Sequence, residues 1–222
     1  MNEEKEILWE PWQFPNISLY KTKLTEDVMD YLWSCIKQAE EDNVDNSNDY
    51  SYRLAGNISG SLGLKDKDNW FLDKIVGPLT NKIMKERPHV YEPPVDVDES
   101  IKHKLQPSLK LNWWVNYQYQ TEFNPMHMHD GITSFVIWMK IPTDWKEQHE
   151  LPFAKNSNGP LASDFQFTYT DILGHVQDYP IPMDSDKEGV ILLFPSRLRH
   201  QVYPFYNCDK ERISISGNIV RT

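Results

Sequence analysis

After Pro94 the sequence consists of short runs of β-branched and aromatic residues, each separated from the next by turn-forming residues. The runs are LKLNWWVNYQYQ, SFVIWMKIP, DFQFTYTDI, GVILLFP, HQVYPF and RISISGNIVR, and the separators include NP, DG, NSNGP and NCDK. Such side chains suit the pleated surface of a strand, and no helical pattern lies between the runs. Successive short strands without intervening helices indicate an antiparallel sandwich or barrel. We therefore expect residues 95–222 to form a jelly-roll core.

Two amphipathic helical patterns precede these strands. Residues 24–42 have Thr25 as a candidate N-cap and apolar side chains at helical spacing. Residues 68–88 show the same spacing, with Pro78 inside the pattern as the expected source of a kink and Pro88 as its end. The sequence thus predicts a mainly β fold in which two or more N-terminal helices, within residues 1–94, support the jelly roll. Residues 1–222 are expected to form a single domain.

Three further segments are expected to be loops. The glycine-rich stretch 51–64 is read either as a mobile loop over a site or as an ordinary connection between helices. Residues 151–159 and 177–189 are rich in Pro, Asn and Asp, and we expect loops at strand ends there. His149 and His175 lie in or beside these loops and are predicted to be surface residues.

Composition argues against several classes of protein. The formal net charge of −10 argues against general binding to nucleic acid, because nucleic-acid binders usually present a basic face. No apolar run approaches the roughly 20 residues of a membrane span. The N-terminal sequence MNEEKEILWEPWQFP has neither the basic start nor the apolar stretch of a secretory signal, which predicts a cytoplasmic protein. Two cysteines are too few for a disulfide framework.

The stretch NPMHMHD, residues 124–130, is the first candidate for a site. If it is a strand, the side chains of His127 and His129 lie on one face, and those of Met128 and Asp130 on the other. Neutral imidazole is the commonest metal ligand among side chains. The spacing therefore suits a chelating pair, although an HxH pattern alone also occurs by chance.

Two later segments add polar side chains that could reach the same place. GVILLFPSRLRH reads as a buried strand, a tight turn and His200 at the start of the next strand. In RISISGN, alternation places Arg212, Ser214 and Ser216 on one face of a strand. An inward Arg212 would require an anion, whereas an outward one would leave the neighbouring isoleucines to fill the core. Periodicity does not choose between these two orientations.

In combination, HxH, GxxxxFPSxxxH and RxSxS in this order resemble the 2-oxoglutarate- and Fe(II)-dependent dioxygenases, in particular a prolyl 4-hydroxylase-like branch of hydroxylases. The resemblance covers about residues 109–219. It implies a double-stranded β-helix that holds Fe(II) through His127 and His200. It also implies that 2-oxoglutarate is the co-substrate, bound by Arg212 and Ser214. Contributions from Tyr117 and Asn218 are implied less directly.

The sequence departs from the family pattern at the second metal ligand, where a carboxylate is expected and His129 stands. Three alternatives remain open. His129 completes a site of three histidines; Asp130 turns inward because Gly131 relaxes the strand geometry; or two histidines bind iron without hydroxylation. The first alternative is the one we favour.

The expected activity is hydroxylation of an unidentified small-molecule or peptide substrate, with release of succinate and CO2. Two other classes compete with this interpretation. A cupin-like metal-binding protein or isomerase also uses HxH on a jelly roll, but a glutamate normally follows the pair, where this chain has Ile132, Thr133 and Ser134. A metal-free structural jelly roll is the other alternative, because fold alone does not determine function.

Overall fold

The computed structural model describes residues 19–86 and 108–221. Their strands are β1 Tyr20–Lys23, β2 Gly60–Gly63, β3 Leu109–Gln118, β4 Asn124–His127, β5 Thr133–Lys140, β6 Phe165–Thr170, β7 Val176–Ile181, β8 Val190–Pro195, β9 Arg199–Val202 and β10 Arg212–Arg221. The α-helices are α1 Glu26–Asp42, α2 Gly77–Glu86 and the short α5 Trp145–His149. No helix in this part of the chain is long and apolar enough to cross a membrane.

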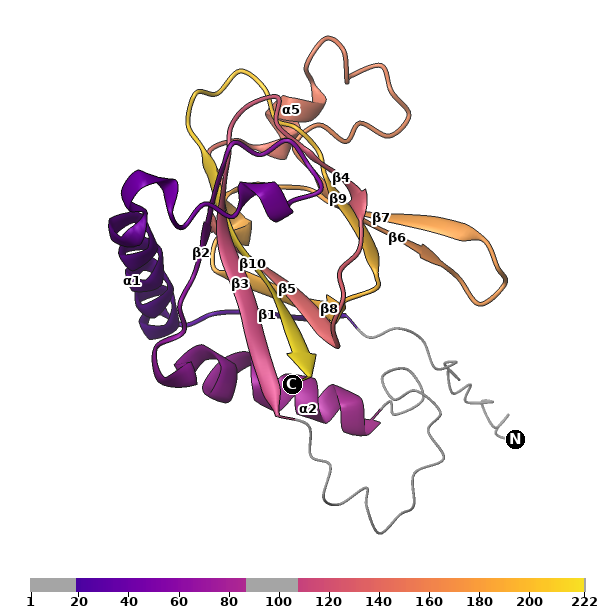
Figure 1. The fold of residues 1–222 in the computed structure, drawn as a ribbon. Helices are drawn as coiled ribbons and strands as arrows, with labels where there is room; N and C mark the ends of the chain where they lie inside the picture. Colours follow the sequence, from indigo (N-terminus) through magenta and orange to yellow (C-terminus); the bar gives the residue numbers. More distant parts are fainter. Residues whose placement is uncertain (1–18, 87–107, 222) are drawn as a thin grey trace, which may run out of the picture.

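The strands form two antiparallel sheets that face each other (Figure 1). The larger sheet has the order β1-β8-β5-β10-β3-β2, and the smaller has the order β4-β9-β6-β7. From β3 to β10 the chain passes repeatedly from one sheet to the other, so strands distant in sequence become neighbours. This is the strand order of a double-stranded β-helix, and it confirms the predicted jelly roll.

The large sheet is buried on both faces, by different partners. On one face Val115, Ile137 and Ile215 pack with apolar residues of α1 and of the segment that leads into α2. On the other face Val136, Trp138 and Leu192 pack against residues of the small sheet such as Phe165 and Phe167. Alternating residues of one strand therefore enter two separate cores. As Figure 1 shows, the helices lie outside the barrel and leave its interior to the two sheets.

The first predicted helix is confirmed, with Thr25 as the N-cap residue of α1. The second is interrupted where the proline was expected to act. Residues Leu72–Val76 form a π-helical turn, and regular α-helix begins at Gly77. Pro78 has no N–H to donate to the preceding turn, so the hydrogen-bond ladder changes register there. Pro88, its expected end, lies outside the described residues.

Two of the expected loops contain strands. Residues 51–64 include β2, whose backbone pairs with β3 from Gly60↔Tyr117 to Gly63↔Trp114. Residues 177–189 include most of β7, which pairs with β6. Both strands lie at the edge of a sheet, where few apolar side chains are needed. For that reason neither shows the apolar alternation on which the sequence reading depended. Residues 151–159 do consist of turns, as predicted.

Gly217 in β10 provides a test of this packing. A Cβ at this position would lie 2.6 Å from ring carbons of Phe135 and 2.8 Å from Cβ of Trp113, which are both buried. Gly217→Ala is expected to lower the free energy of unfolding by about 1–3 kcal/mol, because the crowded core must shift. Urea unfolding measures this loss. Gly159→Ala is the control, because a Cβ there meets nothing within 4 Å; an equal loss in both variants would contradict the packing argument.

Candidate metal centre and pocket

The three histidines singled out in the sequence lie together at the small sheet. His127, at the end of β4, pairs directly with His200 of β9. His129 lies beyond the end of β4, where its backbone N–H donates to the carbonyl of Ser196 at 2.8 Å. The ring centroid of His127 lies 4.3 Å from that of His200 and 4.9 Å from that of His129. One ring nitrogen of each of the three lies within 4.8 Å of the others, close enough to hold one metal ion.

Hydrogen bonds orient two of these rings. Nδ1 of His127 lies 2.7 Å from the carbonyl oxygen of Pro125, and Nδ1 of His200 lies 2.9 Å from that of Leu198. A carbonyl oxygen only accepts, so each Nδ1 must carry the proton and donate it. Nε2 of both rings is then unprotonated, which is the form that can bind a metal, and Nε2 of His127 lies 3.4 Å from the side-chain amide nitrogen of Asn124. Metal-binding histidines commonly show this arrangement, because the outer hydrogen bond fixes both tautomer and ring orientation.

Burial keeps the three imidazoles neutral. Burial, together with a smaller effect of the nearby His127, lowers the pKa of His200 to about 3. Burial likewise lowers the pKa of His129 to about 4, although the negative charge of Asp130 partly offsets the effect. The pKa of His127 is also lowered by burial. Since a metal competes with protons for imidazole, neutral rings at ordinary pH are in the form that binds metal.

Asp130 does not join this group. It is exposed, and its carboxylate is not among the ligand atoms that converge with the imidazoles. The next residue, Gly131, has φ +126°, so the chain does turn sharply there. The turn leads into β5, and the side chain of Asp130 stays outside. Of the two residues considered for the second ligand, His129 lies with His127 and His200, and Asp130 does not.

A pocket of about 190 Å³ extends from the histidines between the two sheets. One wall is the inner face of β10, which presents Arg212, Ser214, Ser216 and Asn218. The intervening residues Ile213, Ile215 and Ile219 pack on the helix side of the sheet. The two orientations considered for this strand are therefore compatible, because both of its faces are buried. Arg212 points inward and the isoleucines still fill a core.

Arg212 is only 2% exposed, yet it has no direct ion pair among the described residues. Its Nη2 donates to the carbonyl oxygen of Ser163 at 2.8 Å and to the Ser163 hydroxyl, and its Nη1 makes a long contact of 3.5 Å with Gln118. Its Nε has no partner. Burial lowers the pKa of Arg212 to about 10, and the charge of Asp164 partly opposes this effect. The guanidinium stays charged and retains an unused donor.

Two placements predicted from sequence need correction. Tyr117 lies on the opposite face of β3 from the pocket, and its hydroxyl donates to Glu40 of α1 at 2.6 Å. The residues of β3 that do face the pocket are Trp114, Asn116 and Gln118, because alternation selects the even-numbered positions. Tyr117 is therefore not placed to bind a ligand of this pocket.

His149 is the second correction. Its side chain is 13% exposed and its Nε2 lies 3.1 Å from Oδ1 of the buried Asp164, whereas the prediction placed it on the surface. Its position on the short helix α5 hides it against the chain that carries Ser163. His175 is largely exposed, as predicted.

The sequence named Trp114 among aromatic residues that could line a pocket or fill the barrel, whereas Asn124, Tyr50 and Arg53 were given no role. Trp114 and Asn124 each line the pocket with a buried polar atom, Nε1 and Oδ1 respectively, that has no partner. Tyr50 and Arg53 come from the segment read as a loop or connection. Tyr50 and Arg53 could not be found from a local pattern, since β2 and the turn before it carry no strong apolar pattern.

A comparison with known protein families matches residues 112–218 to the family described as "Putative 2OG-Fe(II) oxygenase". These residues run from β3 through β10 and include the three histidines and Arg212. Residues 112–218 belong to this oxygenase family. Membership of this family implies that the oxygenase domain uses Fe(II) as its metal and 2-oxoglutarate as its co-substrate.

Two solved structures are similar to this chain. A prolyl-4-hydroxylase from Pseudomonas putida is 13% identical, with 92% of each chain covered and a TM-score of 0.49. An oxidoreductase of the 2OG-Fe(II) oxygenase family from Burkholderia pseudomallei is 16% identical, with 53% of this chain and 47% of that chain covered and a TM-score of 0.36. A search of curated proteins found no match.

Proposed function

We propose that this oxygenase hydroxylates an organic substrate, consumes 2-oxoglutarate and O2, and releases succinate and CO2. The observation that carries the proposal is the convergence of three neutral imidazoles at one end of a buried pocket that also holds an arginine. We assign His127, His129 and His200 as the ligands of Fe(II).

The donor set fits an Fe(II) ion. Imidazole suits iron, and related oxygenases bind it with two histidines and one carboxylate while other positions stay open. Here all three ligands would be neutral, so the full metal charge would remain uncompensated by the protein. An anionic co-substrate would offset that charge. The presence of His129 where related oxygenases have a carboxylate is therefore compatible with binding of the dianion 2-oxoglutarate.

Arg212 is assigned as the anchor for the far carboxylate of 2-oxoglutarate. It lies on the pocket face of β10 with its Nε unpaired, and Ser214 follows on the same face. A guanidinium binds a carboxylate through charge-assisted hydrogen bonds, and these are strong where water is excluded. Ser163 holds Nη2, so the guanidinium is fixed before a ligand arrives.

The bound metal and co-substrate would supply the oxidising chemistry, in which 2-oxoglutarate loses CO2 and a substrate C–H bond is oxidised. The protein provides the enclosure. Val136, Trp138 and Phe165 form an apolar wall of the pocket and limit the access of water. Trp114 Nε1 and Asn124 Oδ1 remain as a donor and an acceptor that could orient a bound molecule.

Anaerobic titration tests the proposal. We expect Fe(II) to bind, and subsequent 2-oxoglutarate to produce a visible charge-transfer band because its keto and carboxylate oxygens chelate the metal. Glutarate is the matched control, since it lacks the keto group and should give no band. Admission of O2 should then form succinate. Absence of the band in folded, Fe(II)-loaded protein would refute the assignment of the co-substrate.

A further inference from the structure

The charge of the pocket lining differs from that of the whole protein. The chain has a formal net charge of −10. Among the described residues that line the pocket there is neither aspartate nor glutamate, whereas two arginines are present, Arg53 and Arg212. An acidic protein that keeps carboxylates out of one cavity and places guanidinium groups there provides a site for anions.

Arg53 and Arg212 are distinct in position. Arg212 is buried on β10, while Arg53 is exposed and belongs to the 3-10 turn Ser51–Arg53 between α1 and β2. If Arg212 binds 2-oxoglutarate, as proposed above, its charge is used by the co-substrate. The second guanidinium is then left for another ligand.

Only uncharged groups hold Arg53 in place. Its Nε donates to the hydroxyl of Tyr52 at 2.9 Å, and its Cζ lies 5.2 Å from the ring centroid of Tyr50 and 5.3 Å from that of Tyr52. It forms no ion pair with any described residue. Tyrosine rings position a guanidinium by cation–π contact without neutralising it. Its full charge is available at the pocket.

A row of aromatic contacts connects Arg53 with the metal centre. The ring of Tyr50 stacks on that of Trp114, with centroids 5.0 Å apart and planes 15° apart. Trp114 in turn meets His129 edge to face at 5.9 Å. A molecule held by Arg53 would therefore extend along this aromatic surface toward the proposed iron ligands.

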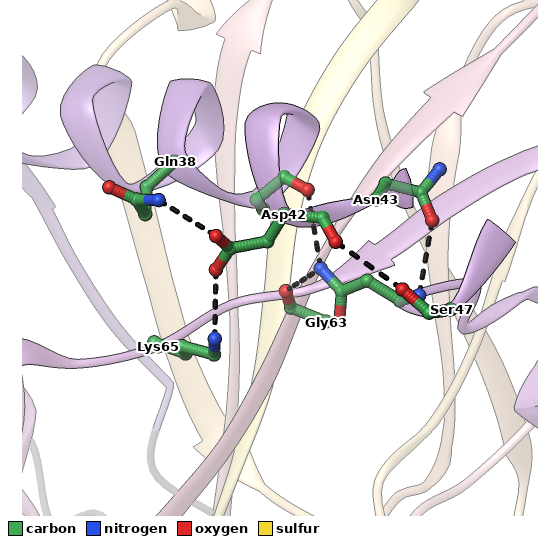
Figure 2. A network of polar contacts seen from close by, with 8 residues as sticks. Gln38, Asp42, Asn43, Ser47, Gly63 and Lys65 are labelled. Carbon is green, nitrogen blue, oxygen red and sulfur yellow. Dashed lines mark hydrogen bonds and ion pairs between the residues drawn. The ribbon is translucent and has the colours of Figure 1, made fainter. Parts of the chain in front are cut away.

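The segment that carries Arg53 is anchored on both sides. Figure 2 shows the first anchor, where Lys65 Nζ donates to the carboxylate of Asp42 at 2.8 Å. The side-chain amide of Asn48 also donates to the carbonyl oxygen of Gly63 at 2.8 Å. On the other side, the backbone N–H of Ser59 donates to Oε1 of Glu122 at 3.1 Å. These contacts join the segment to α1, β2 and the chain before β4. Arg53 is thus presented from a supported turn.

We infer that the substrate of this oxygenase carries a carboxylate or phosphate group, which Arg53 binds at the edge of the pocket while the rest of the substrate lies along Tyr50 and Trp114. The inference rests on the proposed function. Arg53 is then a determinant of specificity, because a neutral analogue would leave its guanidinium without a counter-charge.

Calorimetric titration of small anions tests this inference without knowledge of the substrate. Methyl phosphate and acetate are the probes, added anaerobically to protein loaded with Fe(II) and 2-oxoglutarate, so that the metal and Arg212 are occupied. Arg53→Gln is expected to weaken binding of the preferred probe by about 10-fold or more, because a charge-assisted contact is lost. Arg53→Lys should retain part of the affinity. A carboxylate substrate predicts tighter binding of acetate, and a phosphate substrate tighter binding of methyl phosphate.

Arg221→Gln is the matched control, since it removes the same charge from an exposed residue that does not line the pocket. Its affinity for both probes should equal that of the unaltered protein, and Arg53→Gln should bind 2-oxoglutarate normally. Equal probe affinity in Arg53→Gln and unaltered protein would overturn the inference, as would a parallel loss of 2-oxoglutarate binding. If Fe(II) or 2-oxoglutarate fails to bind, the proposed function falls, and titration of metal-free protein still compares Arg53→Gln with Arg221→Gln.

Discussion

His129→Ala is expected to weaken Fe(II) binding by about 100-fold or more and to abolish formation of succinate from 2-oxoglutarate. Loss of a residue that only hydrogen-bonds a metal ligand already weakens metal binding by about 10- to 100-fold, and loss of a ligand itself should cost more. The ring of His129 lies 4.9 Å from that of His127 and 5.1 Å from that of His200, so its removal leaves an incomplete set of donors. Anaerobic titration with Fe(II), followed by calorimetry, measures the loss. Succinate formation measures the consequence for turnover.

Asp130→Ala is the matched control for this experiment. It alters the adjacent residue, whose exposed carboxylate is not among the converging ligand atoms. We expect its Fe(II) affinity to equal that of the unaltered protein. The reverse result, with iron binding lost in Asp130→Ala and kept in His129→Ala, would show that the carboxylate moves inward when the metal binds. Thermal unfolding of both metal-free variants establishes that each is folded.

Arg212→Met is expected to weaken 2-oxoglutarate binding by about 100-fold while Fe(II) affinity changes little, since a buried charge-assisted contact contributes a few kcal/mol to binding. Methionine retains much of the side-chain volume but supplies neither charge nor donors. Arg212→Lys retains the charge without the planar fork, and an intermediate affinity is expected. Two anaerobic titrations, one with the metal and one with the co-substrate, separate the effects.

The buried position of Arg212 also predicts a cost in stability. Its replacement leaves the carbonyl oxygen of Ser163 without a donor and removes the cation that faces Phe205 at 5.2 Å. Both variants should therefore unfold at lower urea concentration than the unaltered protein, and binding must be measured where they remain folded. Comparable losses of Fe(II) and 2-oxoglutarate affinity in folded Arg212→Met would contradict its assignment as the co-substrate anchor.

The strands that enter a core could be predicted from the sequence, because burial demands apolar side chains at a regular period. β3, β5, β6, β8, β9 and β10 were all indicated in this way. β1, β2 and β7 were missed, and all three are edge strands, which are specified by backbone pairing more than by side chains. Sequence periodicity carries no record of such pairing.

In the candidate site, too, some positions could be predicted from the sequence and others depend on long-range pairing. The convergence of His127 and His200 follows from the jelly-roll strand order, which the family resemblance anticipated. Tyr117 was misplaced because alternation along β3 has two possible phases, and only the positions of α1 and the small sheet decide which phase faces the pocket. The position of Arg53 at the pocket depends on a turn whose place is set by long-range contacts, and no local pattern could indicate it.

The two-faced packing of β10 has a consequence for how this protein tolerates insertions and deletions. One residue added within the strand would exchange its faces, so that isoleucines entered the pocket and Arg212 or its neighbours entered the helix-side core. Both ligand binding and the free energy of unfolding would be reduced, whether the residues before or after the insertion kept their pairing. Residues 151–159 form turns outside the sheets and should accept changes in length. Variation in length among functional relatives is therefore expected to be confined to such turns and absent from β10.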